Sequence, residues 1–150
     1  DPWKLQQVLV NLITNARQAM LAQQGGGRLF IGARTVNGNG DITPRVQVRV
    51  ADTGPGIAPD LMTRIFEPFF STKDPGQGMG LGLSICDEIV RRHRGSIWAE
   101  NNPEGGAVFV VELPVVGRLR EEVAPQVRSL PGHYWGVLRH AEGSTRACPG

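Results

Sequence analysis

Four glycines at alternate positions constrain this chain more than any other feature of its sequence. Gly76, Gly78, Gly80 and Gly82 lead directly into an apolar-periodic segment over residues 81–90. Glycine lets the backbone approach a ligand closely and adopt positive φ angles. The helix predicted beyond the run would present unpaired N–H groups and a positive dipole end, both of which favour a phosphate. Such a run is also typical of an ordinary loop before a helix, so its meaning depends on the surrounding residues.

The composition predicts one soluble globular domain with a substantial core. The chain has 150 residues, of which 40% are apolar and 20% charged, and its net charge of +2 is too small to indicate a nucleic-acid partner. We find no apolar run long enough for a membrane span and no secretory signal, and we therefore expect a cytoplasmic domain with both cysteines, Cys86 and Cys148, reduced. The first residue is Asp rather than Met, so we expect a part of a longer protein.

The first predicted element is an amphipathic helix that begins at Asp1-Pro2 and ends before Gly25. Its core-facing stripe consists of Leu5, Val8, Leu9, Leu12, Ile13, Ala16, Ala19 and Met20. Beside this stripe runs a polar line that includes Asn11 and Asn15, one turn apart. Asn is a mediocre helix former. The pair is either a solvated edge or a carboxamide oxygen held out for Mg²⁺, a cation that prefers oxygen ligands.

Four strands are predicted, the first two from their alternation of apolar and polar residues. They are Arg28–Val36, Arg45–Ala51, Ser96–Glu100 and Ala107–Leu113. In the second strand we expect the valines to face the core and Arg45, Gln47 and Arg49 to face out. A short helix is predicted over Pro59–Phe66, and a longer one from Leu81 that ends near Gly95. Residues 117–150 show no sustained period and predict a linker or a poorly ordered tail.

Two segments between these elements carry side chains of chemical interest. Asp52 ends the second strand, where it either caps the turn or accepts a hydrogen bond from an exocyclic amine such as N6 of adenine. That acceptor would select adenine over guanine, whose O6 only accepts. The aromatic segment Phe66–Phe70 either packs in the core or supports the base of the glycine-rich loop, and Lys73 in that loop is either a phosphate contact or simply solvated.

The order of these segments resembles the ATP-binding catalytic domain of sensor histidine kinases, within the gyrase/Hsp90/histidine kinase/MutL ATPase superfamily. Asn11-Leu-Ile-Thr-Asn15 is similar to the N box and Asp52-Thr-Gly54-Pro-Gly56 to the G1 box. Phe66–Phe70 is similar to the F box and Gly78-Met-Gly80-Leu-Gly82 to the G2 box. The resemblance covers residues 1–116 and leaves out the tail.

This resemblance implies an α/β fold of the Bergerat type, an α+β two-layer sandwich. A mixed, mostly antiparallel sheet would be covered on one face by three helices, and ATP would lie between the helix layer and a mobile lid. It implies catalytic roles for Asn11 and Asn15, with Asn15 as the Mg²⁺ ligand, and contact of Asp52 with adenine. The other nucleotide-binding residues that it implies are Gly54, Gly56, Ile57, Phe70, Lys73, Gly78, Met79, Gly80, Leu81, Gly82 and Leu83.

The resemblance also implies an ATP:protein-histidine phosphotransferase of two-component signal transduction. The phosphate acceptor would be a histidine on a helical dimerisation domain outside this sequence, because His93, His133 and His140 lie in the wrong context. The next acceptor would be the receiver domain of a response regulator. We expect the fragment to be monomeric. The family's hydrolysing members carry a Glu where this chain has Asn11, so we expect slow hydrolysis.

Two other functions stay open at this point. One is an ATPase or a serine kinase of the same superfamily. The other is a nucleotide-binding interaction module without catalysis. The sequence also leaves open whether the full-length protein is anchored in a membrane.

Overall fold

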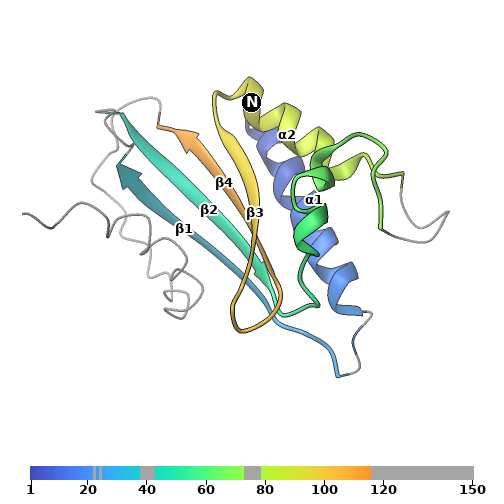
Figure 1. Ribbon diagram of the computed structural model, residues 1–150. Helices are drawn as coiled ribbons and strands as arrows, with labels where there is room; N and C mark the ends of the chain where they lie inside the picture. The colour runs from blue at the N-terminus through green and yellow to red at the C-terminus, as the bar shows by residue number, and fades with distance from the viewer. Residues whose placement is uncertain (22, 24, 38–42, 73–78, 116–150) are drawn as a thin grey trace, which may run out of the picture.

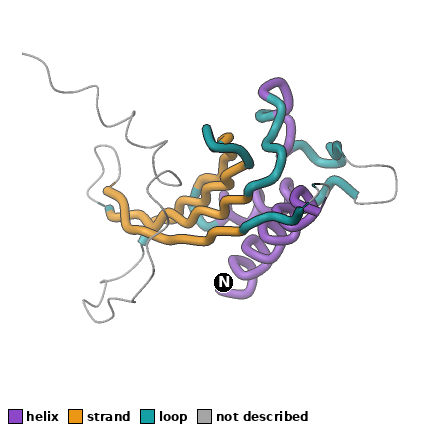
Figure 2. Tube along the Cα trace, turned by 90° about the horizontal axis from the view of Figure 1, so that it is seen from below, coloured by secondary structure: helices purple, strands orange, loops and turns teal. Residues whose placement is uncertain are grey.

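The computed structural model describes residues 1–21, 23, 25–37, 43–72 and 79–115, which form two layers (Figure 1). One layer is a four-stranded sheet in the order β1-β2-β4-β3, and each of its three pairings is antiparallel. The strands are β1 (Leu29–Asn37), β2 (Pro44–Asp52), β3 (Ser96–Asn101) and β4 (Ala107–Pro114). The other layer is a pair of helices on one face of this sheet (Figure 2).

The two helices are α1 (Pro2–Leu21) and α2 (Gly82–Arg92). At the start of α1 the backbone N–H of Trp3 donates to Asp1 Oδ1 over 3.0 Å, as expected of a helix-capping Asp. The buried residues of α1 are Val8, Leu12, Ala16 and Met20, which recur every fourth position along one face. The amphipathic pattern of the sequence therefore predicts both the helix and the face that it buries.

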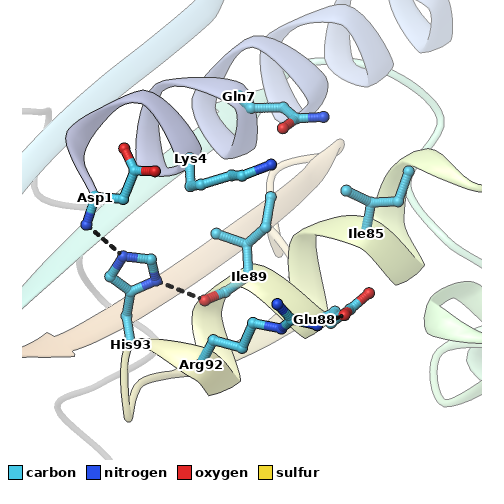
Figure 3. Close-up of a pocket in the computed structure, with 8 residues that line it drawn as sticks. All are labelled: Asp1, Lys4, Gln7, Ile85, Glu88, Ile89, Arg92 and His93. Atoms are coloured by element: carbon cyan, nitrogen blue, oxygen red, sulfur yellow. Dashed lines mark hydrogen bonds and ion pairs between the residues drawn. The ribbon is translucent and has the colours of Figure 1, made fainter.

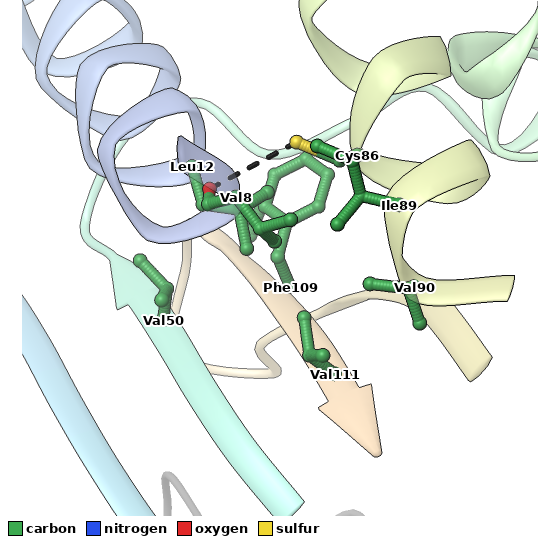
Figure 4. Packing of buried hydrophobic residues seen from close by; sticks show 9 residues of the cluster. Val8, Leu12, Val50, Cys86, Ile89, Val90, Phe109 and Val111 are labelled. Atoms are coloured by element: carbon green, nitrogen blue, oxygen red, sulfur yellow. Dashed lines mark hydrogen bonds between the residues drawn. The ribbon is translucent and has the colours of Figure 1, made fainter. Parts of the chain in front are cut away.

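The core lies between the helices and the sheet (Figure 4). Val8 and Leu12 of α1 and Ile89 and Val90 of α2 pack against Val50, Phe109 and Val111 of the central strands. Cys86 lies in this cluster as a free thiol, and burial raises its pKa to about 11. A thiol that stays protonated in an apolar core is unreactive, in agreement with the expected reduced state of this cysteine.

The fold class is confirmed, with two corrections to the detail. The described residues hold two α-helices instead of three, because the segment Pro59–Phe66 forms two short 3₁₀ turns, Pro59–Leu61 and Arg64–Phe66. Glu67 after them is extended, as Pro68 requires of the residue that precedes it, and this leaves too little chain for a helix. The described sheet is purely antiparallel instead of mixed.

A third correction concerns the side of the sheet that faces away from the helices. Gln47 and Arg49 lie on that side, as predicted, but they are buried, with 2% and 0% of their surface exposed. Alternation along a strand tells which face a side chain occupies and not whether anything covers that face.

Several predictions fall outside the described residues. They concern Lys73 and Gly78 of the glycine-rich loop, most of the turn over 37–41, Cys148 and the tail over 117–150. Of the helices that are described, none has the length and apolar character that crossing a bilayer requires.

Candidate functional site

Asp52 ends β2 with its carboxylate buried on the helix-bearing face of the sheet. The register places it opposite Leu29, and 2% of its surface is exposed. Its Oδ1 accepts hydrogen bonds from the backbone N–H of Gly54 (2.8 Å) and of Ala107 (3.2 Å). Among the described residues Oδ2 has no donor. Burial raises the pKa of Asp52, and the two backbone hydrogen bonds lower it in part.

The loop after Asp52 is shaped by two glycines that the sequence singled out. A Cβ at Gly54 would lie 2.8 Å from Asp52 Oδ1 and 3.3 Å from the Ala19 Cβ of α1. Gly56 has a φ of +79°. A side chain at either position would displace the loop from Asp52. Both glycines are therefore needed for the position of the loop beside this carboxylate.

Asn101, at the end of β3, holds this loop in place and was not among the predicted site residues. Its Oδ1 accepts from the Ile57 N–H over 2.8 Å, and its Nδ2 donates to the Ile57 carbonyl over 2.6 Å. The reciprocal pair spans 44 residues of sequence. An Asn before a turn is common in sequences, and only the fold shows that this one reaches the loop after Asp52.

We predict that Asn101→Ala loosens this loop. The variant loses both hydrogen bonds to Ile57, which should lower the free energy of unfolding by roughly 1 kcal/mol, because each of the two exposed bonds contributes about 0.5 kcal/mol, the lower end of the usual range. Urea denaturation measures this change. Asn102→Ala is not a suitable control, since Asn102 is buried. Glu104→Ala, in the exposed turn that follows, leaves the Ile57 pair intact and should leave loop order, read from amide exchange at Ile57, unchanged.

The first N–H groups of α2 have no hydrogen-bond acceptor among the residues that the structure describes. No side chain caps this helix among the described residues, and its first helical bond runs from the Ile85 N–H to the Leu81 carbonyl (3.0 Å). The N–H groups of Gly82, Leu83 and Ser84 precede that bond and have no partner inside the helix. A Cβ at Gly82 would meet nothing within 4 Å, so open space adjoins these donors. The N–H donors, the positive end of the helix dipole and the adjoining open space together suit an anion such as a phosphate.

The aromatic segment Phe66–Phe70 both packs in the core and contacts the end of the glycine-rich loop, the two alternatives that the sequence left open. Phe66 packs edge-on against Phe109 of the core, with ring centroids 6.5 Å apart. Phe69 is 77% exposed with a φ of 65°, and its N–H donates to the Gly80 carbonyl over 3.0 Å. Phe70 lies under the Arg64 guanidinium, 4.7 Å from its ring centroid. The segment thus joins the core to the residues directly before α2.

Gly80 is required where these two segments meet. Its φ is +65°, and a Cβ there would lie 2.7 Å from the Phe69 carbonyl carbon and from the Phe70 oxygen. These are backbone atoms, which cannot move aside as a side chain can. Beside it Met79 is 79% exposed, and Leu81 and Leu83 are half-buried.

The two asparagines of α1 differ in their surroundings. The Asn11 Nδ2 donates to the Gly82 carbonyl over 3.3 Å, which ties the middle of α1 to the start of α2. Asn15 is half-buried, and its carboxamide makes no hydrogen bond within the described part of the chain. One helix therefore borders both segments, through Ala19 at the loop after Asp52 and through Asn11 at the start of α2.

The residues present suit Mg-ATP. The described residues contain no group of three or more His, Cys, Asp or Glu that could bind a metal by themselves. A carboxamide oxygen such as that of Asn15, together with phosphate oxygens, is the kind of ligand set that Mg²⁺ commonly accepts. The uncapped N-terminus of α2 suits a phosphate group. The buried acceptor Asp52 suits a base that carries an amino group.

A cavity of about 500 Å³ lies elsewhere, between the N-terminal end of α1 and the C-terminal half of α2 (Figure 3). None of the predicted site residues lines it. His93 is at its rim: Nδ1 lies 2.7 Å from the Ile89 carbonyl and must carry the proton, since a carbonyl only accepts. As predicted, His93 is a residue of the C-terminal end of this helix.

Comparison with known proteins identifies the family of this chain. The model of the histidine kinase-, DNA gyrase B- and HSP90-like ATPase family matches residues 1–117. The two-component sensor PprA of Pseudomonas aeruginosa is 45% identical over 116 residues, which are 75% of this chain and 12% of PprA. The adaptive-response sensory kinase SasA of Trichormus variabilis is 40% identical over 117 residues, which are 77% of this chain and 27% of SasA. The chain thus spans about a quarter or less of these curated relatives.

Solved structures share the fold of this chain. The nucleotide-free catalytic domain of histidine kinase ThkA is 40% identical, with a TM-score of 0.62 over 76% of this chain and 68% of that domain. Full-length ShkA in complex with AMPPNP is 36% identical, with a TM-score of 0.61 over 74% of this chain and 21% of ShkA. The chain belongs to the histidine kinase-, DNA gyrase B- and HSP90-like ATPase family, and it has the fold of a histidine kinase catalytic domain.

Proposed function

We propose that this chain binds Mg-ATP and transfers the γ-phosphoryl group to a histidine on a helical dimerisation domain. The observation that carries this proposal is the junction at Gly82. There the uncapped start of α2 adjoins open space and is tied to α1 by Asn11, one turn from Asn15. Residues 1–116 form the catalytic unit. The phosphoryl group would then pass to a receiver domain of a response regulator, in the cytoplasm.

Asp52 recognises the base in this proposal. Both backbone donors in reach bind Oδ1, so Oδ2 can accept a hydrogen bond from the N6 amine of adenine. Guanine carries O6 at the equivalent position, and two acceptors facing each other repel. Gly54, Gly56 and Ile57 would form the wall of the base pocket with their backbone, in the loop that Asn101 holds.

The triphosphate lies at the start of α2 in this proposal. The N–H groups of Gly82, Leu83 and Ser84 would bind its oxygens, with Met79, Gly80 and Leu81 alongside, and Phe70 would support that segment. Lys73 and Gly78, which lie outside the described residues, are proposed as further nucleotide contacts. Asn15 would hold Mg²⁺, which supplies positive charge against the phosphate oxygens when bound.

In this proposal Asn11 favours transfer over hydrolysis. A carboxamide cannot take a proton from water, and the Asn11 Nδ2 already donates to Gly82. The chain therefore positions the nucleotide and leaves the nucleophile to another domain, as phosphoryl transfer allows. We expect hydrolysis of ATP by this chain alone to be slow, and the chain alone to be monomeric.

The proposal is tested by adding a domain that carries the acceptor histidine. The chain is mixed with γ-³²P-ATP, Mg²⁺ and the helical dimerisation domain of its own full-length protein. The expected result is a phosphorylated acceptor whose label is lost in acid and stable in base, and which is absent when the acceptor histidine is replaced by Gln.

Two outcomes contradict this proposal in different ways. A label that survives acid would identify a hydroxyl acceptor and favour a serine kinase. Unlabelled acceptor together with intact ATP binding would favour a nucleotide-binding module without catalysis. Isothermal titration of the same sample with ATP separates the second outcome from a chain that has not folded.

A further inference from the structure

The turn between β3 and β4 packs against Asp52 at one end of the sheet (Figure 1). The register of β2 with β4 ends at the pair Ala51 and Val108, one residue before Asp52. Beyond that pair, the Ala107 N–H donates to the Asp52 Oδ1 over 3.2 Å. A Cβ at Gly106 would overlap the Asp52 carbonyl group, so the turn also lies directly against the backbone of this residue. The residue that ends β2 is therefore held by the β3–β4 hairpin as well as by its own loop.

The backbone of this turn has little steric restraint of its own. Gly105 and Gly106 have φ angles of +104° and +88°. Glycine reaches such angles readily, but it also has the largest choice of conformations. Ala107 follows directly, so the direction of its N–H depends on the conformation of both glycines. Hydrogen bonds within the turn must therefore fix these glycines if the Ala107 N–H is to keep its direction.

Asn102 makes three of the hydrogen bonds that fix the turn. Its N–H donates to the Gly106 carbonyl over 2.9 Å, and its carbonyl accepts from the Gly105 N–H over 2.9 Å. Its side-chain Oδ1 accepts from the Glu104 N–H over 3.2 Å. An Asn whose side-chain oxygen binds an N–H two residues further on forms an Asx turn. The first two bonds use main-chain atoms, whereas the third needs a side-chain acceptor at this position.

Two N–H donors at Oδ1 favour the ionised form of the Asp52 carboxyl. Burial raises the pKa of Asp52, and the hydrogen bonds from Gly54 and Ala107 lower it in part. Gly54 belongs to the loop after Asp52, whereas Ala107 follows the β3–β4 turn. An ionised carboxylate only accepts hydrogen bonds, whereas a protonated carboxyl can donate to the O6 of guanine. The conformation of the turn therefore affects which base this carboxyl prefers.

We propose that Asn102 is a positioning residue for base recognition. Its side chain holds the β3–β4 turn in the conformation that directs the Ala107 N–H at Asp52 Oδ1 and leaves Oδ2 for the base. This inference rests on the proposed function, in which Oδ2 accepts a hydrogen bond from the N6 amine of adenine. Asn102 acts on the base through Ala107 and Asp52, without a contact of its own to the nucleotide.

Two substitutions separate the side-chain acceptor from the rest of Asn102. Asn102→Ala removes the acceptor for the Glu104 N–H. Asn102→Ser is the matched control, because a Ser hydroxyl can accept from the same N–H, although more weakly. Ser also removes the Asn102 Nδ2, but that group has no hydrogen-bond partner among the described residues. Glu104, the titratable residue of the turn, is unchanged in both variants.

Calorimetric titration with ATP and GTP measures the base preference, and carboxyl ¹³C NMR of the unliganded chain measures the pKa of Asp52. For Asn102→Ala we expect a higher pKa of Asp52. The preference for ATP over GTP should fall roughly three- to tenfold, the factor that one hydrogen bond contributes to an affinity. Asn102→Ser should stay close to the parent. A residue needed only for folding would change the stability in urea and leave the base preference unchanged.

A base preference and a pKa of Asp52 that both equal those of the parent, in folded Asn102→Ala, would overturn the inference. An equal loss of ATP affinity in the Asp52→Asn background would also overturn it, because the effect would then bypass Asp52. Should Asn102→Ala not fold, the parent decides: the Ala107 amide proton should shift as Asp52 ionises, and a constant signal overturns the inference. A parent that binds ATP and GTP equally would instead contradict the role of Asp52 in the proposed function.

Discussion

Replacing Asp52 by Asn is expected to weaken ATP binding by roughly 10- to 100-fold while leaving the fold intact. The Asn Oδ1 can still accept from Gly54 and Ala107, so the loop keeps its shape. The group that replaces Oδ2 becomes an NH₂, which faces the N6 amine of adenine as a second donor. The loss of a hydrogen bond to a charged acceptor costs about 1.5–3 kcal/mol, and each 1.4 kcal/mol is a tenfold change in affinity.

The same substitution should change the pH dependence of stability. Burial raises the pKa of Asp52 in the folded chain, so this carboxyl stabilises the fold most when protonated, at acidic pH. That contribution is lost as the pH rises through the raised pKa, and at neutral pH the buried charge is a cost. Asn cannot ionise. We therefore expect the variant to be at least as stable as the parent at pH 7, with this part of the pH dependence removed.

Calorimetric titration with ATP and GTP, with urea denaturation at pH 5 and 7, measures these effects. The parent should prefer ATP, and the variant should lose most of that preference, since an NH₂ can donate to the guanine O6. Equal binding of ATP and GTP by the parent would remove the role given to Asp52. A variant that loses stability at pH 7 would contradict the account of its buried charge.

Gly82→Ala should separate nucleotide binding from folding. The added methyl meets nothing within 4 Å in the unliganded chain, and Ala is favoured over Gly in helices by up to about 1 kcal/mol. Stability should therefore stay the same or rise. A phosphate bound to the first N–H groups of α2 needs the space that the methyl would fill, so the Kd for ATP should rise roughly tenfold or more. Urea denaturation and calorimetry measure the two effects on one sample.

Gly80→Ala is the matched comparison, two residues away. Here φ is +65° and the methyl would overlap backbone atoms of Phe69 and Phe70. The left-handed conformation alone costs a non-glycine residue roughly 1–2 kcal/mol, so this variant should lose stability as well as ATP affinity. If Gly82→Ala binds ATP as the parent does, phosphates do not approach the start of α2.

The elements that could be predicted from sequence are those with a long, regular period. The stripe of α1 and the alternation in β2 fix which side chains share a face, and the glycines at 54, 56 and 80 mark tight backbone approaches. Asn101 and the 3₁₀ turns over 59–66 could not be predicted in this way. The first depends on a contact across 44 residues, and the second on the competition between a short helix and Pro68.

The burial of Arg49 shows a further limit of sequence patterns. Alternation placed it correctly on the face of the sheet away from the helices, and its charge then suggested exposure. Whether a face of the sheet is covered depends on contacts with residues distant in the sequence. The alternation within one strand holds no information about those contacts.

The central claim is that Mg-ATP binds between the loop after Asp52 and the start of α2. Titrating the ¹⁵N-labelled chain with Mg-AMPPNP, a nucleotide that is not readily hydrolysed, and following the amide signals tests it most directly. We predict the largest shifts at Gly54, Ile57, Gly82, Leu83 and Ser84. Largest shifts at Lys4, Arg92 and His93, around the cavity between α1 and the end of α2, or no shifts in a folded chain, would contradict the claim.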